Sequence, residues 1–197
     1  RRARTAPLSG GRPTMGPSVP FALAAKLAYP DRPVIAISGD GAMQMLGING
    51  LITIAHRYKQ WIDPRLVVLV LDNGDLNMVT WEQRVMGGER KFEGSQVLPA
   101  FPYADYARSL GLHGIRVDDP EALGSAWDEA LRADRPVVLQ VLTDPKVPPV
   151  PPHVSAKQVK SYAKALTQRD PEAVGIVMAS AKEWWDGLFG GKGKKKS

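Results

Sequence analysis

An aspartate and an asparagine each follow an apolar run of the chain, and both side chains carry oxygen atoms that bind hard cations. Asp40, in the sequence Gly-Asp-Gly, follows the run 34–37, and Asn73 closely follows the run 66–71. Mg²⁺ accepts such oxygen ligands, and a glycine turn that opens a helix presents backbone N–H groups to an anion. The pattern therefore predicts a site for a magnesium-bridged diphosphate, although Gly-Asp-Gly alone is equally compatible with a plain strand-to-helix turn.

The elements that must position these residues alternate between helix and strand. This alternation predicts an α/β fold with an open, mostly parallel sheet and helices on both faces. Strands are predicted at 33–38, 66–72, 114–117 and 136–143, and helices at 17–29, 43–58, 76–86, 103–110, 120–133, 155–168 and 171–188. The segment 87–99 is predicted to be a loop, and the proline-dense segment 144–153 an extended strap. Because consecutive parallel strands often neighbour each other, Asp40 and Asn73 are expected to meet at the carboxyl edge of the sheet.

Composition excludes several classes of protein. The chain has 197 residues, 44% of them hydrophobic, which is enough for one substantial core. The net charge is +6, but lysines 192 and 194–196 supply four of those charges, so the body of the chain does not suggest nucleic-acid binding. The absence of cysteine excludes disulfides and thiolate metal sites. No apolar stretch suggests a signal peptide or a membrane span, so we expect a cytoplasmic protein.

Several blocks of sequence, in this order, carry a family resemblance. They are "SGGRPTMG", "PVIAISGDGAMQM", "VLVLDNGDLNMV" and the segment from "YADYARSLG" to "VVLQVLTDP". Together they resemble the C-terminal diphosphate-binding domain of thiamine diphosphate-dependent enzymes of the acetolactate synthase and pyruvate oxidase group, over roughly Ser9–His153. The resemblance implies the thiamine diphosphate-binding fold.

The resemblance also implies roles for individual residues. The magnesium ligands would be the side chains of Asp40 and Asn73 and the backbone carbonyl of Asp75. The diphosphate would lie at the turn that begins at Gly39, against backbone amides of Gly41, Ala42, Leu76 and Asn77. Met15 would support the cofactor in a bent shape, and backbone groups of Pro13 and Met15 would contact its aminopyrimidine ring. For Met15, ordinary core packing is the alternative.

Some positions depart from the family pattern. The interval between Asp40 and Asn73 is several residues longer than usual, and the surplus falls in "YKQWIDPR". Pro13 stands where glycine is common, and Asp72 replaces the first of two asparagines. Glu82 stands about where acetolactate synthases tend to carry a tryptophan, which argues against that specific activity.

Enzymes of this group also need a pyrimidine-binding domain, whose glutamate activates the cofactor, and the chain has no room for it. We therefore expect a 2-oxo acid decarboxylating enzyme of which this chain is the carboxyl-terminal part, inactive alone and without catalytic residues of its own. FAD, if used, would bind a domain outside this segment. A homo-oligomer is expected, because the cofactor normally spans two domains, commonly from different subunits. The alternative is a noncatalytic α/β assembly or regulatory module that retains the fold.

Three parts are predicted along the chain. Residues 1–153 would form the cofactor-binding domain, without its first strand; residues 154–189 would form a helical extension, and residues 190–197 a disordered basic tail. The aromatic and basic residues near the end could contact an anionic membrane surface, but a solubilising tail is the preferred interpretation.

Overall fold

The computed structural model describes residues 14–147 and 155–180. The chain forms two compact units. The first comprises the described residues up to Asn73 together with Ala100–Thr143, and the second comprises Gly74–Pro99 with the described residues from Asp144 onward. The predicted boundaries near residues 153 and 189 stay predictions.

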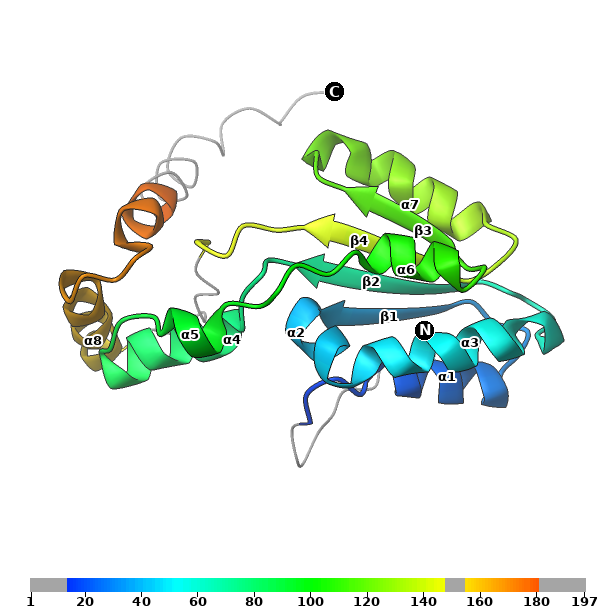
Figure 1. The fold of residues 1–197 in the computed structure, drawn as a ribbon, viewed down its shortest axis with the longest axis horizontal. Helices are drawn as coiled ribbons and strands as arrows, with labels where there is room; N and C mark the ends of the chain where they lie inside the picture. The colour runs from blue at the N-terminus through cyan, green and yellow to red at the C-terminus, as the bar shows by residue number, and fades with distance from the viewer. Residues whose placement is uncertain (1–13, 148–154, 181–197) are drawn as a thin grey trace, which may run out of the picture. The chain divides into compact units, whose positions relative to one another are not determined.

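A parallel sheet of four strands forms the centre of the first unit (Figure 1). Its strands are β1 (Val34–Gly39), β2 (Leu66–Asp72), β3 (His113–Val117) and β4 (Val137–Leu142), in the order β1-β2-β4-β3. All three pairings are parallel, and Gly39 at the end of β1 lies opposite Leu71. The predicted strands and the predicted α/β class are thereby confirmed, because β-branched and leucine residues fill strands that are covered by helices.

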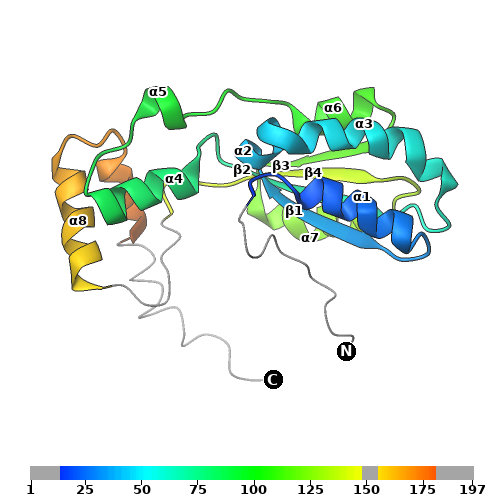
Figure 2. The ribbon, with the colours of Figure 1, turned by 90° about the horizontal axis from the view of Figure 1, so that it is seen from below.

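Helices cover both faces of this sheet. The first unit contains α1 (Ser18–Ala28), α2 (Asp40–Ala42), η1 (Met43–Gly47), α3 (Ile48–Arg57), η2 (Tyr58–Gln60), α6 (Tyr103–Ser109), η4 (Pro120–Ala122) and α7 (Leu123–Arg132). Buried residues of α1, α3 and α6 form one core with one face of the sheet, and those of α7 form a second core with the other face. Figure 2 shows α3 and α6 on the side of the sheet opposite α7.

The helix predicted at 43–58 is one continuous run that begins earlier, at Asp40, and contains the π-helical segment η1. Such wide turns inside α-helices are frequent at functional sites. Gly50 in α3 permits close packing against α1, since a Cβ atom at this position would lie 2.6 Å from Cγ1 of Val19. Gly50 therefore serves the packing of α3 against α1.

The second unit is helical. It contains α4 (Asn77–Glu82), the π-helical η3 (Gln83–Gly87), α5 (Glu93–Gln96) and α8 (Ala156–Thr167), and residues 173–180 are also helical. The predicted helices at 76–86 and 155–168 are confirmed, and the latter begins at a capping box made by Ser155 and Gln158. The short helix α5 corrects the prediction of a loop over 87–99. Its four residues are too few for a helical hydrophobic period to be recognised.

Within the two described stretches, no helix has the length and apolarity needed to cross a membrane. The cytoplasmic location stays a prediction. Pro13, most of the proline-dense strap and the tail at 190–197 lie outside the described residues.

Candidate functional site

Asp40 and Asn73 meet at the carboxyl edge of the sheet, as predicted. The backbone N–H of Asn73 donates to Oδ2 of Asp40 over 2.9 Å, and the N–H of Gly41 donates to Oδ1 over 2.8 Å. Asp40 is only 4% exposed. Two backbone amides thus fix the orientation of a buried carboxylate that follows β1 directly.

The glycine turn before Asp40 converts strand to helix. Gly39 ends β1 in an extended conformation with φ −80° and ψ 161°, and the helical run starts at the next residue. Gly41 is buried, and Ala42 is half-buried. The first N–H groups of a helix lack intrahelical acceptors, so this turn has the local arrangement that suits an anion.

Met15 lies on a turn that packs against the same helical run. Gly16 has φ +93°, and a Cβ atom there would lie 2.9 Å from the carbonyl oxygen of Ala42 and 2.9 Å from Cβ of Leu46. Met15 itself is 44% exposed, so it does not pack as an ordinary core residue within this chain. Pro13, its predicted companion, is outside the described residues.

The buried Tyr103 and the half-buried Gln44, which the sequence did not indicate as site residues, support this edge of the sheet. The hydroxyl of Tyr103 donates to the backbone carbonyl of Asp40 over 3.1 Å, and Nε2 of Gln44 donates to that hydroxyl over 3.1 Å. Burial, offset in part by the Gln44 hydrogen bond, raises the pKa of Tyr103 to about 12, with smaller contributions from the charges of Asp40 and Asp72. Tyr103 therefore remains a hydrogen-bond donor at neutral pH.

Gln140 joins three further segments. Its Nε2 donates to Oδ2 of Asp72 over 2.6 Å and to the carbonyl of Phe101 over 3.3 Å, while its Oε1 accepts from the N–H of Ala104 over 3.1 Å. A polar residue inside the apolar strand β4 is the signal in the sequence that could have identified it.

Asp75, Leu76 and Asn77 begin the second unit. The carboxylate of Asp75 is buried and lies 3.1 Å from Nζ of Lys91. Nδ2 of Asn77 donates to the carbonyl of Pro145 over 2.8 Å. The N–H of Leu76 donates to the carbonyl of Gln96 over 2.8 Å, so this amide has a partner inside its own unit. A diphosphate contact from the Leu76 amide would require that hydrogen bond to be exchanged, and the assignment stays a prediction.

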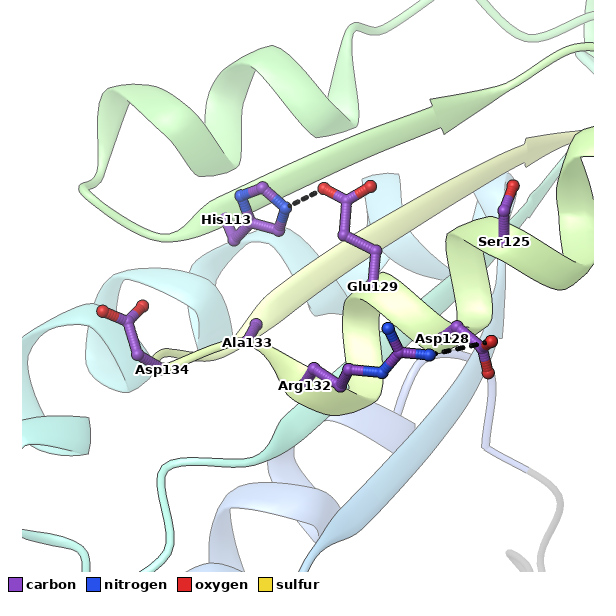
Figure 3. Close-up of a pocket in the computed structure, with 7 residues that line it drawn as sticks. All are labelled: His113, Ser125, Asp128, Glu129, Arg132, Ala133 and Asp134. Carbon is purple, nitrogen blue, oxygen red and sulfur yellow. Dashed lines mark hydrogen bonds and ion pairs between the residues drawn. The ribbon is translucent and has the colours of Figure 1, made fainter.

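A surface cavity of about 540 Å³ lies at the other end of the sheet (Figure 3). There, Nε2 of His113 lies 2.6 Å from Oε1 of Glu129, and Arg132 pairs with Asp128 over 3.0 Å. His113 begins β3, and Ala133 and Asp134 precede β4, so the cavity is at the amino ends of the strands. Exposed pairs of this kind contribute little to stability, and the cavity is separate from the Asp40 edge.

Side chains suited to metal binding do not cluster on their own. Among residues 14–147 and 155–180, no group of three or more His, Cys, Asp or Glu side chains is arranged to hold a metal ion. A cation at Asp40 would therefore need amide, main-chain or ligand oxygens beside the carboxylate. Mg²⁺ tolerates this, because it usually takes one or two carboxylates and completes its shell with phosphate and water.

Comparison with known protein families agrees with this geometry. Residues 1–141 match the model of the family described as thiamine pyrophosphate enzyme, C-terminal TPP binding domain. The chain belongs to this family. It is thus a thiamine pyrophosphate-binding domain, and its parallel sheet with helices on both faces is that of the family.

Two curated relatives illustrate the similarity. The relative named "Putative thiamine pyrophosphate-containing protein YdaP", from Bacillus subtilis, is 36% identical over 176 residues, which are 89% of this chain and 29% of that protein. The acetolactate synthase isozyme 3 large subunit of Escherichia coli is 38% identical over 140 residues, covering 69% of this chain and 23% of the relative.

A solved structure is also similar. The thiamine diphosphate-dependent 4-hydroxybenzoylformate decarboxylase of Rhodococcus jostii superposes with a TM-score of 0.57 at 28% identity, over 66% of this chain and 23% of that one. The chain therefore spans less than a third of the length of each of these relatives.

Proposed function

We propose that the chain supplies the diphosphate- and magnesium-binding part of a thiamine diphosphate site, in an enzyme that decarboxylates a 2-oxo acid. The observation that carries the proposal is the pairing of Asp40 with Asn73, since the 2.9 Å hydrogen bond brings the Asn73 main chain to a buried carboxylate beside a helix start. The donor set is one carboxylate and one amide, which suits Mg²⁺ bound together with a diphosphate.

The residues of the first unit would divide the work of binding. Asp40 and the Asn73 side chain would supply oxygen ligands to Mg²⁺. The diphosphate would lie at the turn that begins at Gly39, against the Ala42 amide and against the Gly41 amide once the latter exchanges its 2.8 Å hydrogen bond with Oδ1 of Asp40. The Asp75 carbonyl is the third ligand that the family resemblance implies. Met15 would contact the cofactor ring. When bound, thiamine diphosphate supplies the electron sink for cleavage of the bond to the carboxyl group.

Exposed apolar side chains support a partner for the first unit. Ile35 and Ile37 are 51% and 62% exposed on one face of β1, and Met45 and Leu46 are 58% and 42% exposed next to the Asp40 turn. Single exposed apolar residues are normal, but several near one site suggest a covered surface. We propose that a pyrimidine-binding domain, from the rest of a longer chain or another subunit, covers this region and supplies the activating glutamate. More specifically, we propose that the enzyme is a homo-oligomer in the cytoplasm and has an acetolactate synthase or pyruvate oxidase type of activity.

The experiment that tests the proposal is calorimetric titration of thiamine diphosphate with Mg²⁺ into the chain. Asp40→Asn and Asn73→Ala are measured in parallel, with Asp134→Asn as the matched control. Asp134 is an exposed carboxylate that precedes β4, at the opposite end of the sheet. We expect Mg²⁺-dependent binding that Asp40→Asn and Asn73→Ala each weaken by about tenfold or more, as is usual for loss of a polar ligand interaction, and that the control leaves unchanged.

Binding that is indifferent to Mg²⁺ and to Asp40→Asn would contradict the site. No binding to a folded chain would favour the alternative of a noncatalytic module, unless binding returns when the pyrimidine-binding partner is added.

A further inference from the structure

A network of buried ion pairs runs through the second unit and ends at Asp75. Arg84 binds Asp170 through two hydrogen bonds of 2.8 Å and binds Glu172 through a third of 2.9 Å. Lys91 donates from Nζ to Glu172 over 2.8 Å, and the same Nζ lies 3.1 Å from Oδ1 of Asp75. Two residues from the C-terminal part of the chain are thereby linked to the segment that follows Asn73.

Solvent has little access to these charges. The side chains of Arg84 and Asp170 are fully buried, those of Asp75 and Lys91 are 1% and 5% exposed, and that of Glu172 is 16% exposed. Burial alone would lower the pKa of Lys91, but its hydrogen bonds with Glu172 and Asp75 outweigh burial and raise it. Loss of one partner of such a pair leaves an uncompensated buried charge, which is strongly destabilising.

At the Asp75 end of this network, hydrogen bonds fix the backbone after Asn73. Oδ2 of Asp75 lies 3.5 Å from Nδ2 of Asn77, which also binds the carbonyl of Pro145. The N–H of Leu76 binds the Gln96 carbonyl, and the N–H of Leu98 binds the Gly74 carbonyl over 2.9 Å. The carboxylate of Asp75 thus lies at the base of a closed loop and is held there from the C-terminal side through Lys91.

We propose that Glu172 and Asp170 are positioning residues for the cofactor, which act through Lys91 and Asp75 to set the conformation of residues 75–77. The inference rests on the proposed function, because only the proposed function makes residues 75–77 a loop that binds the cofactor. Charge supports it: the cluster joins two cations to three carboxylates and so carries a formal charge of minus one. An excess negative charge around Asp75 favours a cation at its main-chain carbonyl.

The first arm of the test needs no cofactor. Amide hydrogen exchange is measured on the chain, on Glu172→Gln, on Lys91→Arg and on the control Lys164→Met. Lys164 pairs with Glu89 over 3.3 Å and so also joins α8 to the loop, but both side chains are about half exposed. We expect the Leu76 and Leu98 amides to exchange about tenfold faster or more in Glu172→Gln, while α8 keeps its protection. Lys91→Arg, which keeps the positive charge, and Lys164→Met should resemble the wild type.

Two results of this arm overturn the inference. Unchanged exchange at Leu76 and Leu98 in Glu172→Gln would show that Glu172 does not hold the loop. Loss of protection throughout the second unit would show that Glu172 maintains the unit's fold rather than the loop's position. Lys91→Arg, which keeps the charge but changes the shape of the side chain, would then show whether the fold depends on the ion pair or on packing.

The second arm titrates Mg²⁺ at saturating thiamine diphosphate. We expect the apparent Mg²⁺ affinity to fall about tenfold in Glu172→Gln, the effect typical of removing an outer-shell partner, and to stay unchanged in Lys164→Met. Equal Mg²⁺ affinity in the wild type and Glu172→Gln overturns the inference and leaves the proposed function intact. Absence of any binding to the wild-type chain, with the pyrimidine-binding partner added as well, overturns the proposed function, and the exchange arm still decides whether Glu172 controls the loop.

Discussion

The hydroxyl of Tyr103 donates a hydrogen bond to the backbone carbonyl of Asp40 across 3.1 Å, although 63 residues separate the two in the chain. Tyr103 is fully buried in the core formed by α1, α3, α6 and the sheet. The bond therefore ties the turn that presents the Asp40 carboxylate to the packed interior, so that the orientation of the site depends on a residue of α6.

Removal of this hydroxyl tests the dependence. We expect Tyr103→Phe to lower the free energy of unfolding by about 1–3 kcal/mol, because the buried Asp40 carbonyl loses one of its two donors, keeping the Met43 N–H, and Nε2 of Gln44 loses an acceptor. Urea unfolding measures the loss. Tyr106→Phe, on the same helix, is the control and should change stability less. In the calorimetric titration, Tyr103→Phe should also weaken binding of thiamine diphosphate with Mg²⁺; unaltered binding would mean that the Asp40 turn is held by its other contacts.

The same residue predicts a loss of stability in alkali. Its pKa is about 12 in the folded protein against an ordinary value of 10.0, so the unfolded chain releases the proton first. Stability from this group is complete below about pH 10 and declines as the pH rises toward 12. Unfolding measured across this interval should show a steeper decline for the wild type than for Tyr103→Phe. Parallel curves would contradict the burial of an un-ionised phenol.

Local sequence patterns were sufficient to predict the sheet and the meeting of Asp40 with Asn73. The strands β1, β2 and β4 are short apolar runs, and their length and β-branched content, rather than a period, mark them as strands. The sequence Gly-Asp-Gly also marked the point where β1 ends, because glycine turns interrupt such runs. Strand adjacency followed from the tendency of consecutive parallel strands to pair.

The supporting residues could not be predicted because their partners are distant. Arg84 and Asp170 lie 86 positions apart, and no periodicity connects an arginine on one helix to an aspartate after another. Gln140 carries a local signal, its polarity inside a strand, but its partners at Asp72 and Ala104 depend on the tertiary fold. The π-helical segments escaped prediction for a related reason, since a single wide turn leaves the helical pattern nearly unchanged.

Packing between α1 and α3 gives a third prediction. Gly50→Ala would place Cβ 2.6 Å from Cγ1 of Val19, so we expect a loss of about 1–3 kcal/mol in urea unfolding. The double variant Gly50→Ala/Val19→Ala should lose less than the sum of the two single variants, because the smaller side chain relieves the contact. Gly124→Ala in α7 is the control, since its Cβ would meet no atom within 4 Å, and it should be neutral or slightly stabilising. Additive losses would mean that the destabilisation by Gly50→Ala does not arise from the contact with Val19.

The buried Asp170 predicts sensitivity of the second unit to acid. Burial would raise the pKa of Asp170, but hydrogen bonds from Arg84 and from the backbone amides of Lys91 and Glu172 outweigh it and lower the pKa below the ordinary 3.8. Around that pH the unfolded chain binds more protons than the folded one. Stability from Asp170 is therefore present above about pH 4 and is lost as the pH falls further.

Hydrogen exchange of the Lys91 amide, which donates to Asp170 over 2.9 Å, measures this loss locally. After correction for the intrinsic pH dependence of exchange, we expect its protection to fall as the pH drops below about 4 in the wild type, and to be low and nearly independent of pH in Asp170→Asn. Asp134 is the control, because Arg135 lowers its pKa as well, yet its side chain is 80% exposed. Added salt should screen the Asp134–Arg135 ion pair and so reduce the lowering of the Asp134 pKa. It should leave the pH dependence of the Lys91 amide protection in place, since buried pairs are screened much less. If salt removed the lowering of the Asp134 pKa and the pH dependence of the Lys91 amide protection equally, Asp170 would be accessible to solvent. The description of a buried link from Arg84 to the C-terminal residues would then be wrong.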